Sequence, residues 1–102
     1  MHILVKRQSG FVTAYLSGEL DHHSAGDFKQ QLDDVIRDIG DSDLVLDLKN
    51  LSFMDSSGLG VLLGRYKKLK SRGGSMYLKN PNSQVEKVFN VSGIYNIIRK
   101  IK

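Results

Sequence analysis

Short apolar runs of strand character alternate along this chain with longer segments in which apolar residues recur at helical spacing. Two strand-like runs, at residues 2–6 and 11–16, flank the turn signal Ser9-Gly10, and each later helical segment is followed by another strand-like run. Strands that alternate with helices form βαβ units with parallel strands. The pattern therefore predicts an α/β domain of order β-β-α-β-α-β-α-β, whose mixed, mostly parallel sheet begins with one antiparallel hairpin.

Turn and capping residues set the expected limits of these elements. Gly18 is expected to end the second strand and to open a polar loop. A helix is expected after Ser24, a candidate N-cap, with Gly40 as its stop. The other expected elements are a helix over 57–70 ended by Gly73-Gly74, a short helix that starts within 81–83 and ends at Ser92-Gly93, and strands at 44–48, 76–79 and 97–101.

The length and composition fit one domain over residues 1–102. The chain has no Cys, which excludes disulfides, thiolate metal sites and a cysteine nucleophile. No segment is apolar enough for a signal peptide or a membrane span. We therefore expect a cytoplasmic protein that makes no membrane contact.

The charge is distributed unevenly along the chain. Residues 1–64 carry a net −5 and residues 65–102 a net +9, which together give the overall +4. Such asymmetry can steer a charged partner of any class. A basic DNA-binding domain is one alternative, but no zinc-finger spacing or RNA-binding aromatic motif accompanies the charge, so no nucleic acid partner is expected.

The helix expected over residues 57–70 combines an apolar stripe with three glycines. Its expected buried residues are Leu59, Leu62, Leu63, Tyr66 and Leu69, and its expected outward face holds Gly60, Val61, Gly64, Arg65, Lys67 and Lys68. Each interior glycine costs about 1 kcal/mol relative to alanine. Two reasons for that cost remain open at this point: another molecule approaches the helix closely, or the helix packs closely on its own sheet.

Three N-cap residue types, Asp55, Ser56 and Ser57, stand at the start of this helix. One interpretation is that one of them caps the helix and the others are exposed neighbours. The other is that one serine accepts a phosphoryl group, since free N–H groups and the helix dipole favour a phosphate there. Asp55 and a nearby Asp21 would repel the new dianion, so phosphorylation would act as a binding switch.

Other chemical sites find little support. Asp21, His22 and His23 could suggest a metal or an acid–base pair, but no further His follows, and a polar loop is the preferred interpretation. The glycines at the start of the helix lack the Lys-Ser/Thr pair of a phosphate-binding loop. A small nucleotide-binding or hydrolytic enzyme using Asp21, His22 and Ser56 is an alternative, but no base–nucleophile spacing supports it. We expect no catalytic residue, no metal and no cofactor.

Two segments carry a resemblance to a known family. Residues 18–23, GELDHH, and 51–60, LSFMDSSGLG, resemble the anti-sigma factor antagonists, which are single STAS domains, and the similarity continues through residues 63–67 and 87–93. GELDHH is most similar to the branch that acts on the sporulation sigma factor F. The resemblance implies a STAS fold with helices packed mainly on one side of the sheet. Members commonly carry a further helix after the last strand, which this chain is expected to lack.

The resemblance also implies a function in partner switching. An antagonist of this family is not an enzyme; it binds an anti-sigma factor that is also a serine kinase with bound ADP or ATP. The kinase phosphorylates the serine directly after the aspartate, here Ser56. The unphosphorylated form displaces the sigma factor, the phosphorylated form does not bind, and a PP2C-type phosphatase restores binding. The protein is expected to be a monomer. A stress-response system with other partners is the alternative.

In such a complex the start of the helix enters the kinase beside its nucleotide. Large side chains at Gly58 or Gly60 would obstruct the approach, and phosphate on Ser56 would clash with the nucleotide phosphates. The expected partner-binding residues are Asp21, His22, Asp55, Ser56, Ser57, Gly58, Leu59, Gly60, Val61, Gly64 and Arg65.

Overall fold

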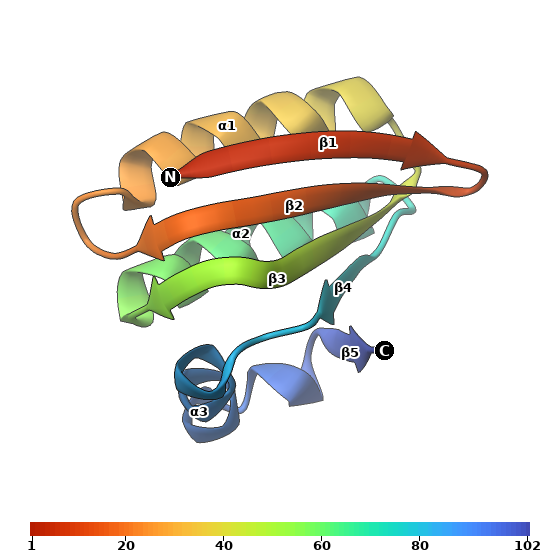
Figure 1. Cartoon of the computed structure of the whole chain (residues 1–102). Helices are drawn as coiled ribbons and strands as arrows, with labels where there is room; N and C mark the ends of the chain where they lie inside the picture. The colour runs from red at the N-terminus through yellow and green to blue at the C-terminus, as the bar shows by residue number, and fades with distance from the viewer.

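The computed structural model describes residues 1–102 as a five-stranded sheet with three α-helices (Figure 1). The strands are β1 (His2–Gln8), β2 (Phe11–Leu20), β3 (Asp43–Met54), β4 (Met76–Lys79) and β5 (Arg99–Ile101). The helices are α1 (Ala25–Ile39), α2 (Ser56–Ser71) and α3 (Ser83–Ser92), and a 3₁₀ turn, Ile94–Asn96, precedes β5. The predicted order of strands and helices is confirmed.

The strands lie in the order β1-β2-β3-β4-β5. β1 pairs with β2 antiparallel, and the three remaining pairs are parallel. This arrangement confirms the predicted mixed sheet with one hairpin at its start. None of the helices combines the length and the apolar character that crossing a membrane requires.

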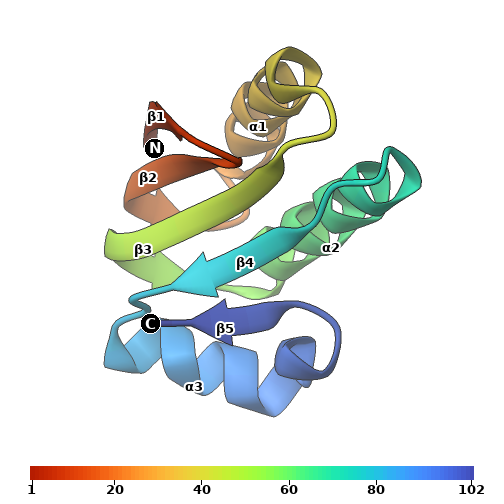
Figure 2. The ribbon, with the colours of Figure 1, turned by 90° about the vertical axis from the view of Figure 1, so that its right-hand side faces the viewer.

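Two helices cover one face of the sheet. Both views show α1 and α2 on the same side of the strands, as predicted, while α3 lies at the end of the sheet that holds β4 and β5 (Figures 1 and 2). Alternate residues of β2 and β3 point to the helices and are fully buried, as expected for half-covered strands: Val12, Ala14, Leu16, Leu44, Leu46 and Leu48. From α3, Val85 and Phe89 join the same core.

The predicted strand ends were less accurate than the strands themselves. Gly18 does not end β2, which continues to Leu20 because its pairing with β3 resumes after two register shifts. Gly18 has a φ of +104°, which glycine adopts without strain, so it is compatible with the irregular pairing. β3 likewise extends to Met54, well beyond the predicted 44–48, whereas β5 is shorter than the predicted 97–101.

Ser24 occupies the predicted N-cap position of α1, but its side chain does not cap the helix. Its hydroxyl instead donates a hydrogen bond of 2.8 Å to the Glu19 carbonyl and accepts one of 3.0 Å from the Asp21 N–H. The serine therefore stabilises the β2–α1 loop. The predicted helix ends are confirmed at Gly40 for α1 and at Gly93 for α3.

Candidate functional site

The loops that follow β2 and β3 meet at one edge of the sheet. Parallel strands end at the same edge, and here Leu20 and Met54 form the last register pair. The next residue, Asp55, donates its backbone N–H to the Leu20 carbonyl at 3.2 Å. This edge, where α1 and α2 begin, lies at the left of Figure 1. The expected residues Asp21 and His22 are thereby brought beside the start of α2.

Asp55 holds the two loops together and caps α2. Its Oδ1 accepts the Ser57 N–H at 2.9 Å, and its Oδ2 accepts the His22 N–H at 3.2 Å. Of the three N-cap residue types, Asp55 is therefore the one that caps. Ser56 is the first residue of α2 and is exposed, and its hydroxyl takes part in no hydrogen bond within the chain. Ser57 is half-buried.

The β2–α1 loop is ordered around the Asp21 carboxylate. Its Oδ1 accepts the backbone N–H of His23 at 2.9 Å and that of Ser24 at 3.0 Å. The Ser24 hydrogen bond is the main reason why the pKa of Asp21 lies below its usual value, although partial burial opposes the effect. The β2–α1 loop thus holds a second carboxylate near the start of α2. The chain contains no group of three or more His, Asp or Glu side chains placed to hold a metal ion.

The three glycines of α2 differ in their surroundings. Gly58 is buried, and a Cβ there would lie 2.7 Å from Cγ of Leu20 and 3.0 Å from Cγ of Met54. Close packing on the chain's own sheet therefore explains Gly58, and the expected obstruction of a partner by a side chain there stays a prediction. Cβ atoms at Gly60 and Gly64 would meet no atom within 4 Å, so these two positions are open to a partner.

The sequence placed Arg65 on the outward face of α2, but this prediction is wrong. It is only 9% exposed, and its Nε lies 3.1 Å from Asp33 Oδ1 on α1. The Nε has no hydrogen-bond partner, so this contact is an ion pair without hydrogen-bond geometry. Arg65 follows Leu62 by three residues and precedes Leu69 by four, a spacing that places all three on one helix face. That spacing could have revealed its burial.

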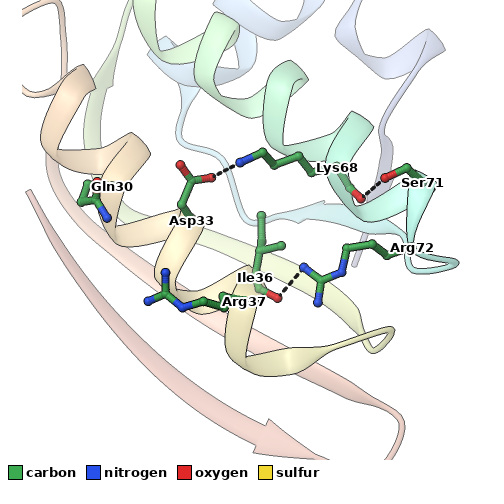
Figure 3. A pocket seen from close by; sticks show the side chains of 7 residues that line it. All are labelled: Gln30, Asp33, Ile36, Arg37, Lys68, Ser71 and Arg72. Atoms are coloured by element: carbon green, nitrogen blue, oxygen red, sulfur yellow. Dashed lines mark hydrogen bonds and ion pairs between the residues drawn. The ribbon is translucent and has the colours of Figure 1, made fainter.

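A groove of about 570 Å³ lies between α1 and α2, at the end of α2 far from Ser56 (Figure 3). Two of its basic side chains already contact other groups of the chain. Lys68 Nζ lies 3.1 Å from Asp33 Oδ1, and Arg72 donates a 2.9 Å hydrogen bond to the Ile36 carbonyl. Since both side chains are already engaged within the chain, the groove is a weaker candidate for a binding site than the Ser56 edge.

Residues 2–102 match the STAS domain family. The chain belongs to this family. Among its relatives, the anti-sigma F factor antagonist of Paenibacillus polymyxa is 42% identical over 98 residues, covering 96% of this chain and 84% of the relative. The anti-sigma-B factor antagonist of Bacillus subtilis (strain 168) is 33% identical over 98 residues, covering 96% of this chain and 88% of the relative.

Solved structures agree with the STAS fold. The anti-sigma factor antagonist SpoIIAA in its unphosphorylated form superposes with a TM-score of 0.78 at 31% identity, over 99% of this chain and 89% of that chain. The phosphorylated form of the Bacillus SpoIIAA gives a TM-score of 0.70 at 30% identity, over 99% of this chain and 92% of that chain.

The STAS domain gathers most of the expected site residues at one surface. Asp55, Ser56 and Ser57 lie beside the β2–α1 loop, and Gly60 is exposed one turn further along α2. Two other expected residues of α2, Leu59 and Val61, are half-buried.

The sequence interpretation missed Gln84 on α3. Its Oε1 accepts the Met54 N–H and its Nε2 donates to the Met54 carbonyl, both at 3.0 Å. No local pattern marks a contact between residues so far apart in the chain.

Proposed function

We propose that this STAS domain is an anti-sigma factor antagonist that works by partner switching in the cytoplasm. Its unphosphorylated form binds, as a monomer, an anti-sigma factor that is also a serine kinase with bound ADP or ATP, and so releases sigma factor F. The kinase phosphorylates Ser56, which ends binding, and a PP2C-type phosphatase removes the phosphate. The domain itself is not an enzyme.

The observation that carries this proposal is that Ser56 is exposed and its hydroxyl makes no hydrogen bond within the chain. Because Asp55 already caps α2, Ser56 is not needed for the cap; it is exposed, and its hydroxyl is free. A free hydroxyl at a helix N-terminus can receive a phosphate without breaking a contact of the fold. The P. polymyxa relative supports the sigma F partner, and the solved phosphorylated form of SpoIIAA supports a phosphorylation switch.

The inactivation follows from charge. A phosphate adds nearly two negative charges at pH 7. It would join Asp55 and Asp21, whose carboxylates are held at this edge by the backbone N–H groups of Ser57, His22, His23 and Ser24. A kinase presents nucleotide phosphates to its acceptor serine. Repulsion between these groups and the modified edge would then prevent binding.

A stress-response partner is the second candidate, because the B. subtilis relative is named as an antagonist of the anti-sigma-B factor. The identity of 42% to the sigma F antagonist against 33% to the sigma-B antagonist favours the first. An enzyme built on Asp21 is less well supported, since Oδ1 of that carboxylate is occupied by the loop backbone.

The test is phosphorylation by the anti-sigma factor kinase of the same organism with ATP, followed by peptide mass spectrometry. We expect phosphate on Ser56 in the wild type, none on Ser56→Ala, and unchanged labelling in the control Ser57→Ala. Equal labelling of the wild type and Ser56→Ala would refute Ser56 as the acceptor. Labelling and tight binding with the anti-sigma-B kinase alone would favour the stress-response alternative.

A further inference from the structure

The end of β3 extends beyond the strand that pairs with it on one side. β4 last pairs with β3 through Lys79 and Asp47, whereas β2 continues on the other side to the pair of Leu20 and Met54. The backbone that leads to Ser56 therefore has a strand neighbour on the β2 side only. An exposed strand edge of this kind leaves N–H and C=O groups without strand partners.

Side chains from the start of α3 replace the missing strand. Asn82 Nδ2 donates to the Leu51 carbonyl at 3.1 Å and to the Ser52 carbonyl at 3.3 Å. The amide of Gln84 hydrogen-bonds both backbone groups of Met54, accepting from its N–H and donating to its C=O, as a neighbouring strand would. Asn82 has a second role, because its Oδ1 caps α3 by accepting the Val85 N–H at 2.8 Å.

The helix that supplies Gln84 is well anchored. Phe89 of α3 is fully buried in the core, and Val85 lies with it. On its outer side, Glu86 forms an ion pair of 2.6 Å with Lys100 of β5 and accepts a hydrogen bond from Tyr95. Gln84 thus links the segment before Ser56 to a fixed part of the fold.

We propose that Gln84 is a positioning residue for Ser56: by clamping the Met54 backbone two residues before the acceptor, it holds the hydroxyl in place for phosphoryl transfer. The role of Ser56 as acceptor rests on the proposed function above. Transfer requires the hydroxyl close to and in line with the γ-phosphate, so a loosened acceptor lowers the rate. A loosened segment would also let Ser57, the next hydroxyl along the chain, compete.

Two substitutions separate positioning from general stability. Gln84→Met keeps the length of the side chain but removes both hydrogen bonds. Gln84→Glu keeps the acceptor for the Met54 N–H and places an oxygen against the Met54 carbonyl. Matched controls on the same helix are Lys87→Met and Asn90→Asp.

The first measurement is the kinetics of phosphorylation by the anti-sigma factor kinase, at a temperature where every variant is folded. We expect kcat/KM at Ser56 to fall about tenfold in Gln84→Met and Gln84→Glu, with a larger share of phosphate on Ser57, while the controls match the wild type. A purely structural role would lower the melting temperature and leave both the rate of the folded protein and the Ser56 to Ser57 ratio unchanged. That result would overturn the proposal.

The second measurement needs no kinase. Amide hydrogen exchange of the free protein should show the Met54 N–H exchanging about tenfold faster in Gln84→Met than in Lys87→Met, with core amides such as that of Leu46 unchanged. Unchanged exchange at Met54 would refute the clamp, even if phosphorylation slowed. If the wild type is not phosphorylated at all, the proposed function fails, and the exchange data alone decide whether Gln84 fixes this segment.

Discussion

Replacing Gly58 with alanine should destabilise the protein, although the same change elsewhere in α2 should stabilise it. A methyl group at Gly58 would lie 2.7 Å from Cγ and 2.9 Å from Cδ2 of Leu20. Cγ is the branch point of that side chain, and Leu20 is fully buried, so it cannot swing into solvent. Either Leu20 or the start of α2 must move.

Two opposing terms set the size of the effect. Alanine gains up to about 1 kcal/mol in helix propensity over glycine, and less in the first turn, where Gly58 lies. Inserting a methyl group into a packed core costs about 1–3 kcal/mol. The overpacking term is the larger, so we expect Gly58→Ala to lower the free energy of unfolding by about 1 kcal/mol. For a domain of this size that shift corresponds to a melting temperature lower by about 4–8 °C.

Gly60→Ala and Gly64→Ala are the matched controls, because a Cβ at either position meets no atom within 4 Å. Each should raise the free energy of unfolding by about 0.5–1 kcal/mol. Urea unfolding monitored by circular dichroism measures all three variants in one experiment. If Gly58→Ala were stabilised as much as Gly60→Ala, the packing explanation for Gly58 would be wrong.

The remaining predictions concern the switch and two ion pairs. Ser56→Ala should bind the kinase like the wild type and Ser56→Asp at least about tenfold more weakly by calorimetry; equal affinity would refute charge exclusion. Arg65→Met should lower the free energy of unfolding by about 1–2 kcal/mol in urea, because Asp33 keeps only its exposed Lys68 contact, and an unaltered midpoint would contradict this. The pKa of Glu86 is lowered, chiefly by Lys100, so its stabilising effect is present above its ordinary value near 4.5 and disappears as pH falls below it. Between about pH 6 and 3 the melting temperature of Glu86→Gln should therefore fall less than that of the wild type. Parallel plots of melting temperature against pH for the two proteins would refute the linkage.

The sequence predicted the elements of this fold well because their signals are local. The apolar spacing of α1 and α2 and the residues at their ends act within a few positions of each other. The strand ends were predicted less well, since the length of a strand depends on the neighbours with which it pairs: β2 continues past Gly18 with β3 paired beside it. The ion pair of Arg65 with Asp33 of α1 is likewise non-local, although the spacing of Arg65 from Leu62 and Leu69 does indicate its burial.

The candidate site also combines features with local sequence signals and features that depend on distant residues. Asp55, Ser56 and Ser57 are adjacent in the sequence, so a capped helix start could be predicted there, but not which of the three caps it. Ser56 as the acceptor stays a prediction that rests on the family resemblance. The frame that holds them is not local: Leu20 packs against Gly58, and Gln84 clamps Met54 from α3. This arrangement accounts for two of the three glycines in α2. Gly58 lets α2 begin close against the sheet, where Leu20 and Met54 leave no room for a Cβ, and Gly60, one turn after Ser56, has open space around it.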